Sequence, residues 1–160
     1  MDLFAPRRLS CGILILNAQH ELLLCHVTGQ DHWDLPKGGA HADEGPLQAA
    51  LRETREETGL ELAADALREL GRFDYRPKKD LHLFATLMPR FDLAQLCCES
   101  HFSQCATGQR LPEMDGFDWV RFEHVGERCT PKMTAVLHGR LNLQRGLDEL
   151  AAAPLVALAA

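Results

Sequence analysis

The segment from Pro46 to Gly59 constrains the fold of this chain more than any other, because it contains signals for both ends of a helix. Proline is favoured at the first position of a helix and glycine just past its end, which is where Pro46 and Gly59 stand. Between them, apolar and small residues recur at the spacing of one helical face: Leu47, Ala50, Leu51, Thr54 and Thr58. The sequence predicts a helix over residues 46–58 with this face buried.

The other apolar segments are short and typical of strands. Residues 12–16 form an unbroken apolar run, as in a strand buried on both faces. Apolar runs and alternation predict strands over 9–16, 21–27, 33–35, 67–75, 79–87 and 117–122. A second helix is predicted over 130–145, with Thr130 as its N-cap and Pro131 at its first position. This order predicts an α/β domain with helices on both faces of a mixed sheet.

Residues 91–112 show no clear periodicity, so no regular element is predicted there. A connection of this length is usually functional or mobile. Within it, Cys97, Cys98, His101 and Cys105 suggest a zinc site. Their spacing is not a pair of separated C-x-x-C knuckles, and adjacent cysteines chelate poorly, so structural zinc is disfavoured.

The length and charge of the chain limit the classes of function. A chain of 160 residues favours one domain, which we place at residues 1–150, followed by an apolar tail at 151–160 that Pro154 interrupts. The net charge of −6 argues against a broad nucleic-acid surface. No apolar run suggests a membrane span, and no signal peptide is evident. The six cysteines then indicate reduced thiols, so we expect a cytoplasmic protein.

Three glutamates lie close together on the predicted helix. Glu53, Glu56 and Glu57 fall within roughly 100° of arc, on one edge beside the apolar face. Like charges at this spacing repel, and the last turn of a helix disfavours anions. Hard divalent cations such as Mg²⁺ and Mn²⁺ accept clustered carboxylates and remove this objection. The alternative is a solvated face on which Arg52 and Arg55 pair with the glutamates.

The loop before this helix favours phosphate chemistry. Gly38 and Gly39 allow the backbone to approach a phosphate closely, and Lys37 beside them can meet a phosphate as a point charge. Five residues separate Gly38 from Glu44, and seven separate Glu44 from the stretch Arg52–Leu60. An anionic substrate at this loop would suit the cation inferred from the glutamates.

This pattern, from Gly38 to Leu60, resembles the signature of the Nudix hydrolases. Every fixed position of the signature is matched. Thr54 departs from it, because the signature has a bulky aliphatic residue there, and the departure affects local packing. The resemblance implies a Nudix α/β/α sandwich with a mixed sheet between helices. It also implies hydrolysis of a diphosphate linkage in a nucleoside diphosphate joined to another group.

The resemblance also assigns roles by position. Glu53, Glu56 and Glu57, with the carbonyl oxygen of Gly38, would hold one or more Mg²⁺ or Mn²⁺ ions. Arg52 would hold the glutamates through ion pairs. Glu44 is expected to be structural, through bonds to loop amides. Many members of the family are dimers, so the resemblance allows a homodimer.

The general base varies within the family and stays open between several carboxylates. Glu56 or Glu53 can serve, or a carboxylate from a later loop. Glu113 is the preferred later candidate, because it lies six residues before Trp119 in the penultimate loop, where relatives often keep a metal-linked glutamate. Glu99 is the second. A solvated loop glutamate is the alternative for both.

Aromatic and basic residues are candidates for substrate binding. Trp33 can stack on a base, with Tyr75 or Phe84 as the opposite wall. Half-buried aromatics at a sheet edge are the structural alternative. A basic group after Tyr75, consisting of Arg76, Lys78 and Lys79, can guide a polyphosphate, or simply form a charged turn.

The expected substrate is a nucleotide or polyphosphate small molecule. Residues 33–38 are most similar to enzymes that act on dinucleoside polyphosphates or related highly charged phosphate compounds. The alternatives are a sanitiser of oxidised nucleoside triphosphates and a nucleotide-sugar or ADP-ribose hydrolase. A nucleotide-sensing module that does not cleave its ligand is a further alternative, but such modules usually lack motif carboxylates, and all are present here.

Overall fold

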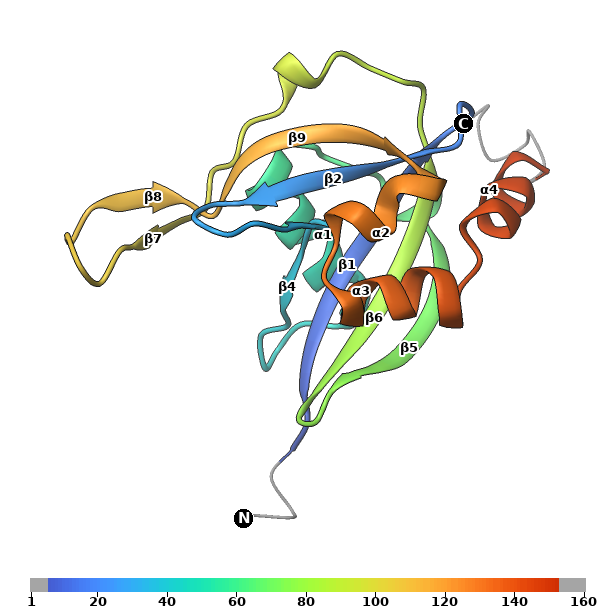
Figure 1. Cartoon of the computed structure of the whole chain (residues 1–160). Helices are drawn as coiled ribbons and strands as arrows, with labels where there is room; N and C mark the ends of the chain where they lie inside the picture. Colours follow the sequence, from blue (N-terminus) through green and yellow to red (C-terminus); the bar gives the residue numbers. More distant parts are fainter. Residues whose placement is uncertain (1–5, 153–160) are drawn as a thin grey trace.

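The computed structural model describes residues 6–152, and within them seven strands form one mixed sheet with helices on both faces (Figure 1). The strand order is β3-β2-β1-β6-β5, with β4 paired to β1 and β9 paired to β2. The strands are β1 (Arg8–Asn17), β2 (Glu21–Val27), β3 (Trp33–Asp34), β4 (Lys37–Gly39), β5 (Arg68–Arg76), β6 (Lys79–Leu87) and β9 (Met114–Arg121). The predicted α/β architecture is confirmed.

Strand β1 lies at the centre of the sheet and organises the site. It runs parallel to β6 from Arg8 to Leu16, and its other edge is shared by two antiparallel strands. Strand β2 pairs only with its end, at Leu16↔Leu22, whereas β4 pairs with its first half, at Gly12↔Lys37. This division places the glycine-containing strand β4 at the same edge of β1 as β2.

The two faces of the sheet bury separate apolar clusters, as the alternation along β1 requires. Ile13 and Ile15 face a cluster that includes Ala49 and Ala50 of helix α1 (Pro46–Thr58). Leu14 and Leu16 face the opposite cluster, which the C-terminal helices cover with Met133, Val136, Leu137, Leu143 and Leu147. Both layers of the sandwich therefore depend on residues that alternate along one strand.

Helix α1 has the bounds that the sequence predicts. Gly59 follows it in the left-handed region, at φ 80°, and its N–H donates to the carbonyl oxygen of Arg55 at 2.8 Å. At the other end the side chain of Gln48 accepts a bond from the N–H of Gly45. The cap residues thus set both ends of the helix that carries the glutamates.

The single second helix predicted over 130–145 is wrong. Thr130 does cap α3 (Pro131–Thr134), which continues through a π-helical turn, η4 (Ala135–Arg140). The chain is then extended at Leu141, and Asn142 caps a new helix, α4 (Leu143–Ala151), by accepting a bond from the N–H of Arg145. Asn142 is a capping residue, but the apolar residues at helical spacing on both sides of it suggested one continuous helix.

Short elements occur where no regular structure was predicted. Residues 91–112 contain a 3₁₀ turn, η2 (Leu93–Gln95), and a two-stranded hairpin, β7 (His101–Ser103) with β8 (Arg110–Pro112). Three further short elements are η1 (Ala64–Ala66), η3 (Phe122–His124) and α2 (Val125–Arg128). Elements of three or four residues are too short to show a hydrophobic period.

The described part of the chain bears on three other expectations. Its cysteines are free thiols. None of the helices within residues 6–152 combines the length and the apolar character needed to cross a membrane. Helix α4 continues through Ala151, the first residue of the expected tail, and residues 153–160 of that tail lie outside the described residues.

Candidate active site

Helix α1 lies against β4, so that the glutamates meet the glycine strand. The carboxylate of Glu53 sits directly over Gly38, in the space that any side chain at this position would need. Gly38 is held in place by its pairing with Cys11 of β1. The Nudix-like pattern thus brings two of its distant members, Gly38 and Glu53, into direct contact.

Glu57 is buried, unlike a residue of the solvated face that was the alternative for the three glutamates. Only 2% of Glu57 is exposed, and its carboxylate accepts a hydrogen bond from the backbone N–H of Lys37 at 3.2 Å. Burial raises the pKa of Glu57 to about 9, the bond from Lys37 opposes this rise, and the charges of Glu53 and Glu113 add to it. A negative charge here needs a cation that residues 6–152 do not supply as an ion pair.

Arg52 joins the loop to the helix. Its guanidinium donates two bonds to Glu44, at 2.7 and 2.9 Å, and one to the carbonyl oxygen of Gly39 at 2.9 Å. The same group contacts Glu53 at 2.9 Å and Glu56 at 3.2 Å. The bonds from Arg52 to Glu44, together with a backbone bond from His41, lower the pKa of Glu44 to about 2. The pairing of Arg52 with the glutamates, which the alternative expected, is present, but the side chains of Arg52 and Glu53 are only 18% and 12% exposed, so this part of the face is not freely solvated.

Glu44 also organises its own loop. Its carboxylate accepts a bond from the backbone N–H of His41 at 3.0 Å, in addition to the bonds from Arg52. The glutamate expected to bond loop amides therefore contacts both a loop amide and the arginine that orients Glu53 and Glu56.

The later loop brings one of the two candidate bases to this cluster. Burial raises the pKa of Glu53, Arg52 opposes this rise, and the charges of Glu56 and Glu113 add to it. Glu113 thus lies near enough to act on the ionisation of both Glu53 and Glu57. Its backbone is fixed by a bond from its N–H to the carbonyl oxygen of Ser100, at 3.0 Å.

Glu99 lies outside the cluster. Its side chain is 58% exposed and is 4.0 Å from the guanidinium of Arg55. Its backbone N–H, by contrast, donates to the carbonyl oxygen of Glu56 at 2.6 Å. Glu99 thus closes the end of α1 through its backbone, while its carboxylate faces Arg55.

The oxygen-rich cluster fits a hard divalent cation. Within residues 6–152 no three His, Cys, Asp or Glu side chains are already arranged as a metal site, and this applies equally to the segment with Cys97, Cys98, His101 and Cys105. Mg²⁺ needs few protein carboxylates, because it keeps waters and takes substrate phosphates as ligands. The buried carboxylate of Glu57, which makes no ion pair within the described residues, and the adjacent Glu53 suit such an ion.

Lys37, Tyr75 and Lys79 come together on the face of the sheet opposite α1. The ammonium of Lys37 lies 3.1 Å from the carboxylate of Asp34 and 5.9 Å from the centre of the Tyr75 ring. Burial lowers the pKa of Lys37, but Asp34 and Tyr75 outweigh this effect, and the pKa is raised. Sequence reasoning missed the role of Asp34. The available signal was that Asp34 stands three residues before Lys37, the residue with which it pairs.

Lys79 lies among other cations. Burial lowers the pKa of Lys79, and the positive charges of Lys37, Arg76 and Arg8 lower it further. Arg76 itself lies over the ring of Tyr75, at 5.1 Å from its centre. An anion would relieve this repulsion, which fits the expected phosphate contacts.

Trp33 lies between two side chains that sequence reasoning missed. The guanidinium of Arg128 is 4.9 Å from the centre of its ring, and the ring of His26 meets it edge-on at 5.1 Å. Phe84 cannot be the opposite wall, because it is buried in the cluster on the α1 face, whereas Trp33 packs on the other face. No sequence signal connected Arg128 with Trp33.

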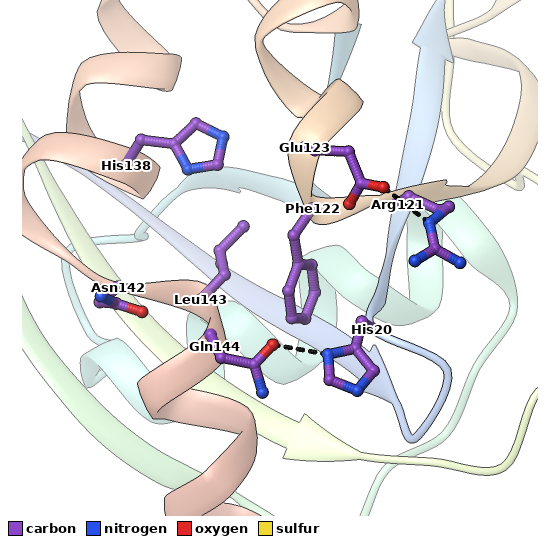
Figure 2. Close-up of a pocket in the computed structure, with 8 residues that line it drawn as sticks. All are labelled: His20, Arg121, Phe122, Glu123, His138, Asn142, Leu143 and Gln144. Atoms are coloured by element: carbon purple, nitrogen blue, oxygen red, sulfur yellow. Dashed lines mark hydrogen bonds and ion pairs between the residues drawn. The ribbon is translucent and has the colours of Figure 1, made fainter.

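A separate hollow lies at the end of the sheet beside α4 (Figure 2). Its volume is about 320 Å³, and its lining includes His20, Phe122, His138 and Gln144. The ring of His20 bonds to the side-chain oxygen of Gln144 at 2.5 Å. None of the residues predicted to form the site lines this hollow.

Known proteins resemble this chain in sequence and in fold. The family model of the NUDIX domain matches residues 6–135. An uncharacterized 17.7 kDa protein of Enterobacteria phage T4 is 38% identical over 122 residues, which cover 69% of this chain and 80% of the phage protein. The RNA pyrophosphohydrolase of Hahella chejuensis is 36% identical over 124 residues, covering 72% of this chain and 76% of that protein.

A solved structure supports the fold. The Ap4A hydrolase of C. elegans, in a binary complex, superposes with a TM-score of 0.60 and 21% identity, covering 90% of this chain and 98% of that protein. At this level of identity the likeness concerns the arrangement of the sheet and helices.

Proposed function

Because this chain belongs to the Nudix family of hydrolases acting on diphosphate bonds, we propose that it is a metal-dependent pyrophosphohydrolase of nucleoside diphosphate derivatives, with dinucleoside polyphosphates as the first candidate substrates. The observation that carries this proposal is the buried carboxylate of Glu57, whose pKa is raised to about 9, beside the Glu53 and Glu56 carboxylates that Arg52 holds. This arrangement favours binding of a cation together with an anionic substrate.

Glu53, Glu56 and Glu57 would hold Mg²⁺ or Mn²⁺, with the carbonyl oxygen of Gly38 as a further ligand. Such an ion neutralises phosphate oxygens and lowers the pKa of a bound water. Arg52 fixes Glu53 and Glu56 relative to the loop, which reduces the rearrangement needed when the ion binds.

The remaining residues would position substrate and move a proton. Glu113, whose charge acts on Glu53 and Glu57, would accept the proton of the attacking water, and Glu53 and Glu56 are the alternatives. Lys37 and Lys79 lie across the sheet from the glutamates, and Lys37 is paired with Asp34 at 3.1 Å, so they would meet only phosphate oxygens that extend away from the cleaved bond around the edge of the sheet. Trp33 would support a base, with Tyr75 beside the phosphates.

A second candidate substrate is the triphosphorylated 5′ end of RNA. The relative from Hahella chejuensis, named an RNA pyrophosphohydrolase, favours it. The two substrates share a polyphosphate joined to a nucleoside, so the glutamate cluster can serve both. In a dinucleoside polyphosphate the second nucleoside is attached to the far end of the polyphosphate, whereas in RNA it is linked to the first nucleoside.

A substrate panel tests the proposal. Diadenosine tetraphosphate, a 5′-triphosphorylated oligoribonucleotide, an oxidised nucleoside triphosphate, ADP-ribose and a nucleotide sugar are each incubated with Mg²⁺, with Mn²⁺ and with EDTA. We expect metal-dependent cleavage of a diphosphate linkage, and loss of at least about a hundred-fold in kcat for Glu56→Gln. Absence of turnover across the panel refutes the enzymatic proposal, and tight binding without turnover indicates a nucleotide-sensing module instead.

A further inference from the structure

The segment just before β7 closes the last turn of α1. The final carbonyl groups of a helix have no partner within it and need donors from elsewhere. Here the N–H of Cys97 donates to the carbonyl oxygen of Thr58 at 2.9 Å. The N–H groups of Glu99 and Ser100 both donate to the carbonyl oxygen of Glu56, at 2.6 and 3.1 Å. This segment therefore fixes the backbone of the turn that carries two of the clustered glutamates.

Ser100 also reaches the later loop. Its N–H bonds Glu56, and its carbonyl oxygen accepts the N–H of Glu113 at 3.0 Å. The carbonyl oxygen of Glu113 in turn accepts the N–H of Thr28 at 3.1 Å. With both of its peptide groups held, the backbone of Glu113 is fixed, and so is the direction in which its side chain leaves the chain. Ser100 thus joins the helix of the glutamates to the candidate base.

The contacts of Ser100 with the site are made by its backbone. Within residues 6–152 its hydroxyl group meets only the thiol of Cys98, at 3.4 Å. The same thiol donates to the carbonyl oxygen of Ser100 at 3.3 Å, so that this oxygen is held from a second side. A side-chain pattern in the sequence could not have indicated this role.

The link lies at the base of the exposed hairpin of β7 and β8 (Figure 1). Ser100 stands immediately before the hairpin and Glu113 immediately after it. A two-stranded hairpin of three-residue strands is marginally stable alone, so it holds its own ends together poorly. The bond between Ser100 and Glu113 supplies the hold that the hairpin lacks.

Resting on the proposed function, we propose that Ser100 is a positioning residue that sets where the carboxylate of Glu113 stands relative to the glutamates of α1. In the proposed reaction Glu113 accepts the proton of the attacking water. A displacement of such a group by about 1 Å costs up to about a hundred-fold in rate. The link touches no part of the proposed substrate contacts at Lys37 and Lys79, so its loss lowers kcat and leaves KM nearly unchanged.

A merely structural role of the link makes a different prediction. If Ser100 only closes the end of α1, its loss lowers kcat by the same factor whether or not the carboxylate of Glu113 is present. If it acts through that carboxylate, its loss has no further effect once the carboxylate is removed. A double-mutant cycle separates the two roles.

Two changes break the link at different bonds. Ser100→Pro removes the N–H that bonds Glu56. An ester in place of the Glu113 amide, introduced by semisynthesis of the full chain through ligation at Cys105, removes only the bond to the Ser100 carbonyl and keeps every side chain. The ester therefore decides the matter if Ser100→Pro fails to fold. The matched control is Ala106→Pro, because Ala106 is exposed in the hairpin loop and its N–H donates no bond within residues 6–152.

Each change is made in the wild-type chain and in Glu113→Gln. We expect Ser100→Pro and the ester each to lower kcat by about ten-fold, with KM within about two-fold. In the Glu113→Gln background the further loss should be less than about two-fold. Ala106→Pro should keep the wild-type kcat.

Binding of Mn²⁺ alone, measured by titration calorimetry, repeats the cycle without turnover. The charge of Glu113 acts on Glu53 and Glu57, so Glu113→Gln should weaken binding of the ion by about three-fold. Breaking the link should weaken it in the wild-type chain and not in Glu113→Gln. If the substrate panel shows no turnover, the proposed function fails, and the metal cycle still decides the role of Ser100.

Three results overturn the inference. The first is an equal loss of kcat, or of Mn²⁺ affinity, in both backgrounds, which makes the link structural only. The second is wild-type kcat and Mn²⁺ affinity for the folded Ser100→Pro protein and for the ester. The third is a rise in KM at unchanged kcat, which assigns the link to substrate binding.

Discussion

A Cβ atom on Gly38 would lie less than 3.0 Å from the carboxyl carbon of Glu53, closer than unbonded atoms approach one another. The backbone of Gly38 is fixed by pairing with Cys11, and the carboxylate of Glu53 is fixed by Arg52, so neither side can easily yield. Gly38 is therefore required by the carboxylate that lies on it. A Cβ atom added to the neighbouring Gly39, in contrast, would have no other atom within 4 Å.

We predict that Gly38→Ala displaces Glu53 and lowers kcat by at least about ten-fold, since small misplacements of a catalytic group are costly. Gly39→Ala is the matched control and should keep kcat within about two-fold. Steady-state kinetics with Mg²⁺ on the best substrate of the panel provides the measurement. Equal kinetics for the two variants would contradict the geometry of this site.

Glu57→Gln should separate stability from metal binding. Because the pKa of Glu57 rises from 4.5 to about 9 on folding, the stability that it contributes is full below about pH 4.5 and is lost as pH rises towards 9. Without metal, glutamine should therefore make the free energy of unfolding depend less on pH in this range, and raise Tm at pH 8.

The same variant should lose the rise in Tm that Mg²⁺ gives to the wild type, because it lacks the charge that binds the ion. Thermal unfolding with EDTA and with Mg²⁺ measures both effects. Glu61→Gln serves as the control, since Glu61 is exposed just beyond the helix. A Glu57→Gln protein that is less stable than wild type in EDTA at pH 8 would be inconsistent with the burial of a costly charge.

Arg52→Lys should impair catalysis although it keeps the positive charge. A lysine cannot bond Glu44, Glu53 and Glu56 in the forked geometry that Arg52 uses. We expect kcat to fall by about ten-fold or more. Arg55→Lys is the control, because Arg55 is exposed and its one ion pair within residues 6–152 is with Glu99, at 4.0 Å. If both variants retain wild-type kcat, Arg52 does not position the glutamates.

Much of the fold could be predicted because its signals are local. Helix α1 begins and ends where Pro46 and Gly59 place it, since capping preferences act over one turn. Strand β6 has the predicted bounds because alternate residues face two different apolar clusters. In both cases a periodic pattern and a clear boundary coincide.

The break between α3 and α4 depends on competing signals. Apolar residues continue at helical spacing across Leu141, so the pattern predicted one helix, but Asn142 bonds the N–H of Arg145 and starts another. The hairpin of residues 101–112 was missed for a different reason, because its three-residue strands contain too few residues for a period.

The site was predictable in composition and less so in environment. Spacing along one helix placed Glu53, Glu56 and Glu57 together. The positions of residues around a helix, however, do not reveal which strand will pack over them. Burial of Glu57 depends on β4, whose Lys37 N–H bonds it from twenty residues away. Contacts between distant segments, such as Arg128 on Trp33, leave no local pattern to detect.

Glu44 should make stability depend on pH in the acid range. Bonds from Arg52 and His41 lower its pKa to about 2 in the folded chain, from 4.5. The stability that it contributes is therefore present above about pH 4.5 and is lost as pH falls towards 2. Glu44→Gln should unfold at lower urea concentration than wild type at pH 6, and the difference should shrink below pH 4.5.

The neighbouring Asp43→Asn is the control for this measurement, because Asp43 is exposed and makes no side-chain bond to Arg52. It should keep the wild-type urea midpoint at pH 6. A difference between Glu44→Gln and wild type that persists undiminished at pH 2.5 would show that the stabilisation does not depend on the charge of Glu44.

Glu113→Gln and Glu99→Gln decide which loop carboxylate takes part in the reaction. The charge of Glu113 acts on both Glu53 and Glu57, whereas Glu99 faces Arg55 at the outer end of α1. We expect Glu113→Gln to lower kcat by about a hundred-fold, as loss of a general base does. Glu99→Gln should change kcat by less than about three-fold, because its backbone contact with Glu56 is kept. The reverse order would assign the proton transfer to Glu99, and equal small effects would leave Glu53 or Glu56 as the base.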